Sequence, residues 1–148
     1  MTLFTSGLTS FLATLGFAVI FNIPRRHLIT ASLNGALGWM LYTLIIQLGG
    51  TTIIANFAGA VTVGLFGELL ANHFRKPATI FIIPGIIPFV PGYGIFYTME
   101  SIMLQNFTEA VSKGSESFMI AVAIASGLIV SSTVGKYVRT YARRRKAS

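Results

Sequence analysis

This sequence has 148 residues, of which 53% are apolar and only 10% are charged, and its formal net charge is +7. A soluble domain averages about 25% charged residues, and a disordered chain has few large apolar residues. The composition therefore excludes both classes. The chain has no cysteine, which excludes disulfides, thiolate metal sites and thiol nucleophiles.

Long intervals carry neither charge nor histidine, namely 1–24, 28–67, 77–99 and 117–135. An apolar helix of about 20 residues crosses the hydrocarbon of a bilayer. The chain is therefore predicted to be an all-α integral membrane protein, with one transmembrane domain over 1–148. We expect five spans and a basic cytoplasmic tail, at about 3–23, 28–48, 52–73, 78–107, 117–135 and 136–148. The first stretch is too long for a signal sequence, so we expect it to be retained. A polar loop is expected over 108–116.

The cations predict the orientation, because lysine and arginine near the spans stay on the cytoplasmic side. With five spans, ten of the eleven cations fall on the side of the Arg25–Arg26 turn, the Arg75–Lys76 turn and the C-terminus, and only Lys113 falls on the other. The N-terminus is therefore expected outside and the C-terminus in the cytoplasm. The basic tail is expected to contact lipid headgroups, not nucleic acid.

Small residues recur every four positions on two spans, and such faces let helices approach closely. The two stripes are Ser6, Ser10 and Thr14, and Ala123, Gly127, Ser131 and Gly135. The sequence leaves open whether their partner helices lie within this chain.

The fourth span contains the run IPGIIPFVPGYG at 83–94. Each proline removes an amide donor, so the carbonyls of Ile80, Pro84 and Ile87 should lose their helical partners. Free main-chain groups persist in a membrane only where protein or a watery cavity meets them. We therefore expect two half-helices joined by an elbow over Pro84–Gly92, near the membrane midplane. The amides that follow Pro91 would then form a carboxylate site. The alternative is a packing kink without a ligand.

The candidate substrate-binding residues are Pro84, Gly85, Pro88, Pro91, Gly92 and Tyr93. Glu68 and Glu100 are candidates for proton coupling or for binding a substrate ammonium group, because intramembrane acids are costly unless they face a polar interior. Alternatively, Glu68 forms an ion pair with Arg75, and Glu100 lies at the membrane interface near the outer headgroups. Three amides, Asn34, Asn56 and Asn72, are candidates for a polar cavity or for helix packing. The mid-span aromatics Trp39 and Tyr42 either line a substrate cavity or face lipid or the helix packing. No phosphate loop, metal-ligand cluster or nucleophile–base pair is found, so we expect no enzyme activity, metal or cofactor.

The runs RKPA at 75–78 and IPGIIPFVPG at 83–92 closely resemble the signature of the threonine/serine exporter family, in its C-terminal five-helix half. That half also occurs as a separate small subunit beside a larger one, as in split threonine/serine exporters and two-component succinate exporters of bacteria. The resemblance implies proton-driven export of small carboxylate metabolites across the bacterial plasma (inner) membrane. It also implies that Pro84, Gly85, Pro88, Pro91 and Gly92 form the transport elbow.

A unit of five spans has its two ends on opposite sides, so a second such unit fused ahead of it would be inverted. Paired inverted units form many secondary transporters, and a larger membrane subunit is therefore the expected partner. Two alternatives remain. The chain could be a scaffold subunit that does not transport, or a self-sufficient homo-oligomeric channel.

Overall fold

The computed structural model describes the backbone of residues 3–146 and the side chains of residues 3–135 and Tyr137. Within these residues every regular element is helical. The elements are α1 (Leu3–Ile20), the 3-10 turn η1 (Arg25–His27), α2 (Leu28–Gln47), α3 (Thr52–Phe74), α4 (Thr79–Ile86), the 3-10 turn η2 (Ile87–Phe89), α5 (Gly92–Met103) and α6 (Phe107–Lys146). The basic side chains of the predicted tail lie outside the described residues.

Four of the described helices (α1, α2 with η1, α3 and α6) are long and apolar enough to cross a membrane, and the bent pair α4–α5 would make a fifth span. This confirms the prediction of an all-helical chain with several membrane-spanning helices. α1 ends earlier than predicted, because Asn22 adopts a left-handed conformation with φ 54° and the amide of Ile23 donates to the carbonyl of Ala18. This hydrogen bond closes the helix in a Schellman turn.

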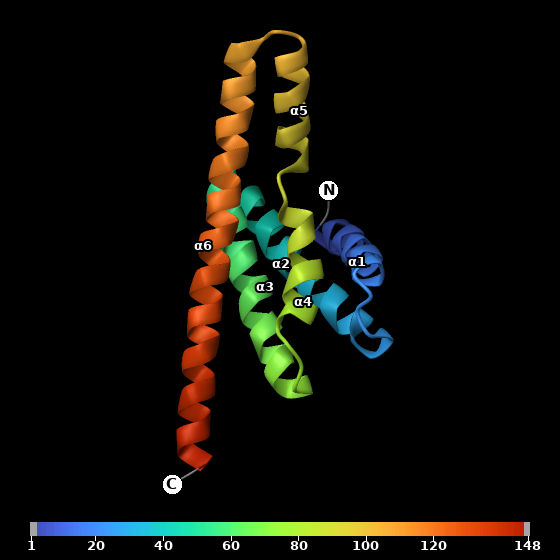
Figure 1. Cartoon of the computed structure of the whole chain (residues 1–148), viewed down its shortest axis with the longest axis vertical. Coiled ribbons are helices and arrows are strands. Elements are labelled where there is room, and N and C mark those ends of the chain that lie inside the picture. The colour runs from blue at the N-terminus through green and yellow to red at the C-terminus, as the bar shows by residue number, and fades with distance from the viewer. Residues whose placement is uncertain (1–2, 147–148) are drawn as a thin grey trace.

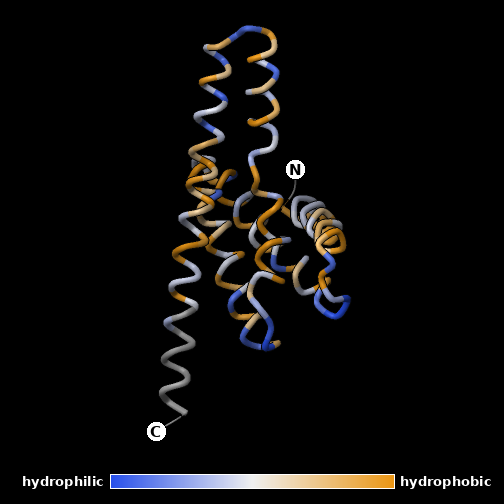
Figure 2. The backbone as a smooth tube through the Cα atoms, viewed as in Figure 1, coloured by the Kyte–Doolittle hydropathy of each residue, from blue (hydrophilic) through white to orange (hydrophobic). Residues whose placement is uncertain are grey.

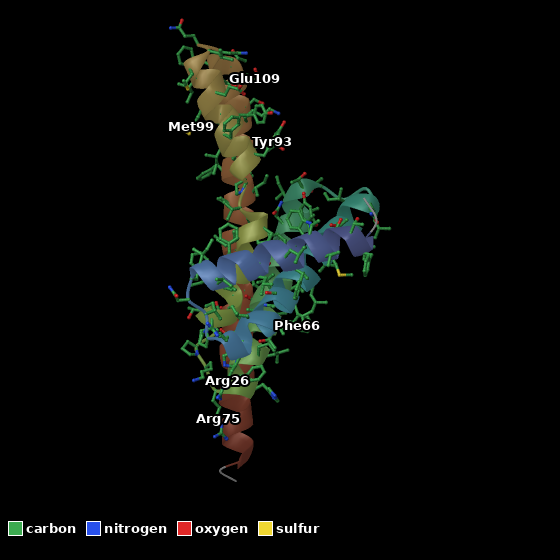
Figure 3. All side chains as sticks on the ribbon, turned by 90° about the vertical axis from the view of Figure 1, so that its right-hand side faces the viewer. Arg26, Phe66, Arg75, Tyr93, Met99 and Glu109 are labelled. Atoms are coloured by element: carbon green, nitrogen blue, oxygen red, sulfur yellow. The ribbon has the colours of Figure 1, made fainter. Side chains whose placement is uncertain are left out.

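The N-terminal helix lies across the others rather than beside them. In Figure 3, α1 runs across the view while α6 runs down it, and Figure 1 looks nearly along α1. The predicted hydroxyl stripe is on the buried face of α1, where Ser6, Ser10 and Thr14 are at most 4% exposed. The hydroxyl of Ser10 donates to the carbonyl of Gly35 on α2 at 3.4 Å. These small side chains therefore allow α1 and α2 to cross closely.

The second predicted stripe holds α6 against α3. Ala123, Gly127 and Ser131 are buried. A Cβ on Gly127 would lie 2.8 Å from the carbonyl oxygen of Phe57 and 3.0 Å from the Cβ of Ala60 on α3, so no larger residue fits there. The partner of this stripe is thus within the chain.

The helix α4 packs against α2 and α3, and the chain then bends by 48° into α5. α5 and the first part of α6 form an antiparallel hairpin that extends beyond the other helices (Figure 1). Four apolar residues on α5 are between 62% and 84% exposed, namely Tyr93, Phe96, Met99 and Met103.

The predicted loop over 108–116 is wrong, because α6 already begins at Phe107. Asn106 caps this start. Its Oδ1 accepts from the amide of Glu109 at 3.4 Å, and its Nδ2 donates to the Glu109 carboxylate at 2.9 Å. This pairing of a cap residue with the third helical residue resembles a capping box, and it extends the helix through a polar segment.

The two cationic turns lie at one end of the molecule. Arg26 and Arg75 point toward the end to which the C-terminal part of α6 runs, while Glu109 lies at the tip of the hairpin (Figure 3). Figure 2 shows hydrophilic segments at these two extremes and hydrophobic segments between them. The predicted orientation requires this grouping of the cationic turns, although the orientation itself stays a prediction.

Candidate functional site

The break in the fourth span is shorter than the sequence suggests. α4 continues through Pro84, η2 adds a tighter turn, and only Val90 and Pro91 separate it from α5. The carbonyl of Ile87 was expected to lose its partner, but it accepts from the amide of Val90 at 3.1 Å. The elbow is therefore centred on Val90 and Pro91, and Pro84 and Gly85 belong to the helix before it.

Phe89 fixes the position of the break. Its side chain is only 2% exposed and fills a notch between two glycines, where a Cβ on Gly38 would lie 3.2 Å from its ring and a Cβ on Gly59 would overlap it. The ring also meets Trp39 and Tyr42 edge to face, with centroids 5.3 and 6.2 Å apart. The glycines of α2 and α3 thus seat the end of η2 at a defined place.

A cavity of about 400 Å³ lies directly at the break. Its walls come from α2, α3, the η2–α5 junction and α6. The lining residues are Trp39, Tyr42, Thr52, Asn56, Pro88, Phe89, Val90, Pro91, Gly92, Tyr93, Gly94, Lys113, Glu116, Ser117 and Ile120. This size lies within the range of small-molecule sites, about 300–1,000 Å³.

One wall of this cavity is aromatic and another is charged. Trp39 and Tyr42 stack with their ring centroids 4.6 Å apart. Lys113 and Glu116 lie one turn apart on α6, Lys113 half-buried and Glu116 exposed. No ion pair of either side chain is found in the part of the chain that the structure describes.

The first turn of α5 also faces the cavity, through Gly92, Tyr93 and Gly94. The amide of Gly92 donates to Val90 at 2.7 Å, and the amide of Ile95 donates to Pro91 at 3.0 Å. The amides of Tyr93 and Gly94 belong to the turn that has no acceptors within its own helix. The N-terminal end of a helix carries a partial positive charge, so this wall can attract an anion.

The structure brings only some of the sequence candidates to this cavity. Pro88, Pro91, Gly92 and Tyr93 line it, as does Asn56, whose Nδ2 also donates to the carbonyl of Thr52 at 2.8 Å. Pro84 and Gly85 are buried and do not line it. A Cβ on Gly85 would lie 3.0 Å from Val63 and 3.4 Å from the main chain of Gly35, so Gly85 allows α4 to approach α2 and α3.

Asn34 joins three helices instead of lining the cavity. It is 1% exposed, and its Nδ2 donates to the carbonyls of Val63 on α3 at 2.9 Å and Phe81 on α4 at 3.2 Å. Because the second acceptor belongs to the proline-containing helix, this amide positions α4 relative to α2 and α3.

The remaining polar candidates lie elsewhere. Asn72 and Glu100 are exposed. Glu68 is half-buried on α3 and faces α6, since a Cβ on Gly135 would lie 2.7 Å from its Cγ. It follows Asn56 by twelve residues, which is about 18 Å along the helix.

The sequence prediction missed Lys113 and Glu116 because it assigned both to a loop. Their signal was present, since charged residues are sparse in this chain and two of opposite sign stand three positions apart at the edge of an apolar segment. Trp39 and Tyr42 line the cavity, which was one of the two interpretations of these mid-span aromatics, although the sequence does not indicate that they lie at the break.

The threonine/serine exporter family matches residues 6–134 of this chain. The chain belongs to this family. Its members are transporters rather than enzymes, and the chain is accordingly a multi-pass membrane protein of a transport family.

Two curated relatives illustrate the match. The chain is 31% identical over 128 residues to a threonine/serine exporter from Corynebacterium glutamicum, a match that covers 86% of the chain and 25% of that protein. It is 28% identical over 118 residues to an uncharacterised protein from Haemophilus influenzae, covering 78% of the chain and 40% of that protein. The chain thus spans less than half the length of either relative. No solved structure gives a significant match.

Proposed function

We propose that the chain is the small subunit of a two-component secondary exporter of small carboxylate metabolites, either threonine and serine or a dicarboxylate such as succinate. It acts in the bacterial plasma membrane with its N-terminus outside, and its broken fourth helix forms part of a substrate site. The observation that carries this proposal is the cavity of about 400 Å³ at the break, in a chain of an exporter family.

The chemistry of the cavity supports a carboxylate substrate. Secondary transporters often bind the carboxylate of a substrate at the N-terminus of a half-helix. Here the first turn of α5 borders the cavity through Gly92, Tyr93 and Gly94, and its amides are oriented for an anion. Asn56 adds a polar side chain, and Pro88 and Pro91 shape the wall.

Proton coupling belongs to Glu68 in this proposal. It is a half-buried carboxyl group within the apolar helix α3, where it packs against α6. Acids within membrane helices are energetically costly and commonly mark proton or ion pathways. Glu100 lies exposed on the hairpin, so it is the weaker candidate. Because α3 also supplies Asn56 to the cavity, movement of α3 against α6 would link protonation to the site.

A larger subunit would supply the missing half. The relatives contain 60–75% of their length outside the matched region, and the exposed apolar residues of α5 leave a surface that a second membrane unit can cover. Two inverted units around a shared site are a common transporter arrangement.

The proposal is tested by efflux of labelled threonine and labelled succinate from bacteria that lack their own exporters for both. Cells express this chain alone, a larger family member encoded in the same genome alone, or both. We expect saturable efflux only with both chains, and we expect it to fall when the proton gradient is collapsed.

Efflux by this chain alone would contradict the two-component proposal and favour a homo-oligomeric pathway, most clearly if flux did not saturate. An intact complex of both chains without efflux of either compound would contradict the exporter assignment and favour a scaffold subunit.

A further inference from the structure

We infer that Lys113 and Glu116 are the charge-recognising pair of this cavity, and that they select a zwitterion over a dicarboxylate. This inference rests on the proposed substrate site at the break, and it assigns specificity to two residues of α6 within this chain. It depends on the arrangement of opposite charges along a single wall.

The positive side of the cavity combines Lys113 with the first turn of α5. These two elements are adjacent, because a Cβ on Gly94 would lie 3.8 Å from the main-chain oxygen of Lys113. Lys113 is half-buried and lines the cavity, and its side chain carries a full positive charge. A carboxylate in the cavity would therefore meet both a full positive charge and helix-end amides.

The negative side lies one turn further along α6, at Glu116. Residues three apart on a helix have Cβ atoms about 5–6 Å apart. An amino acid carries its carboxylate and ammonium groups on one carbon, so both groups can reach the two side chains together. Opposite charges three residues apart on a helix attract each other only weakly. No ion pair between these two side chains is found among the residues that the structure describes, so both charges can pair with a ligand.

The aromatic side chains of the cavity also favour a ligand that carries an ammonium group. Trp39 and Tyr42, whose rings stack on each other, also line the cavity, and aromatic rings attract an ammonium group. A dicarboxylate has no ammonium group, and its second carboxylate would meet the carboxylate of Glu116. The cavity is therefore complementary to a zwitterion and repels a dianion at one end.

The experiment measures binding of labelled threonine and labelled succinate to the purified full chain in lipid nanodiscs by equilibrium dialysis. Fluorescence of Trp39, the chain's one tryptophan, reports whether the ligand enters this cavity. The variants are Lys113→Gln and Glu116→Gln. The matched controls are Glu109→Gln and Lys76→Gln. Glu109 lies two turns nearer the hairpin tip than Glu116 and does not line the cavity, and Lys76 is exposed on the turn between α3 and α4.

We expect Glu116→Gln to weaken threonine binding about fivefold or more, since a hydrogen bond to a charged group is stronger than one between neutral groups, even after discounting for exposure to solvent. The same variant should leave succinate binding equal or stronger. Lys113→Gln should weaken both ligands, and both controls should match the wild type.

The inference would be overturned if Glu116→Gln weakened the binding of threonine and of succinate equally. It would also be overturned if the wild-type chain bound neither compound, or bound succinate more tightly than threonine. The binding assay and the efflux assay distinguish failure of this inference from failure of the proposed function. If only the inference fails, the two-chain complex still exports substrate, with the recognition residues on the partner. If only the proposed function fails, the chain still binds threonine, but the complex does not transport it.

Discussion

The sequence assigns Gly85 and Gly92 to one elbow, but the same substitution should affect stability at the first position and transport at the second. Gly85 lies within α4 against α2 and α3, whereas Gly92 begins α5 and lines the cavity. We expect Gly85→Leu to destabilise the chain and Gly92→Leu to abolish transport while the fold persists. The matched control is Gly16→Leu on the exposed side of α1.

The magnitudes follow from the space at each position. A Cβ on Gly85 would lie 3.0 Å from Val63 and 3.4 and 3.5 Å from main-chain atoms of Gly35. Overpacking of this kind costs about 1–3 kcal/mol. Leucine should reach the upper end or exceed it, because main chain cannot move aside as a side chain can.

A Cβ on Gly92 or on Gly16 would have no neighbour within 4 Å among the described residues. A glycine inside a helix, such as Gly16 in α1, costs about 0.5–1 kcal/mol, and Gly92 is the first residue of α5. Neither variant should therefore be less stable than the wild type. Only the leucine at position 92 extends into the cavity, and we expect efflux to fall at least tenfold there.

The assays are thermal unfolding of the purified chain and efflux from cells that express the two-chain complex at equal levels. Normal efflux with Gly92→Leu would refute the placement of the cavity on the transport pathway. A wild-type melting temperature for Gly85→Leu would refute the close approach of α4 to α2 and α3.

Two further predictions concern polar residues. Asn34→Leu removes the two hydrogen bonds that join α2 to α3 and to α4, and it should lower the free energy of unfolding by about 1–3 kcal/mol. Exposed Asn72→Ala should change that free energy by no more than about 0.5 kcal/mol. Equal melting temperatures for the two variants would contradict the role of Asn34. Glu68→Gln should keep the fold but remove the dependence of efflux on an imposed pH gradient, and Glu100→Gln should retain that dependence. Efflux that still follows the gradient in Glu68→Gln would show that protons couple elsewhere.

The sequence predicts the helices well where apolar length alone decides them. The spans expected at 28–48 and 52–73 match α2 and α3 to within one residue at each end. Helix ends are harder to predict, because the residues in the left-handed conformation after α1, α3 and α5 are Asn22, Arg75 and Gln105 rather than glycine. The start of α6 was missed because the cap at Asn106 outweighs the polarity of the segment after it.

The sequence predicts only the part of the candidate site that is contiguous in the chain, which is the broken fourth span. Proline density identified the break, but it could not separate Gly85, which serves packing, from Gly92, which borders the cavity. The other walls depend on which faces of α2, α3 and α6 turn toward the break. The orientation of these faces depends on close contacts at small residues, such as that of Gly59 with the ring of Phe89. The order of residues along the chain does not reveal these contacts.

The two sides of the break are held by different parts of the molecule. On one side Phe89 is seated between α2 and α3, and on the other α5 packs on the hairpin segment of α6. Between them, only Val90 and Pro91 connect the two helices, and the cavity opens at this connection. Since α6 contacts both α3 and α5, a shift of α6 along α3 would displace Lys113 and α5 together relative to Trp39. A cavity built across such a junction can change its access without any helix unfolding.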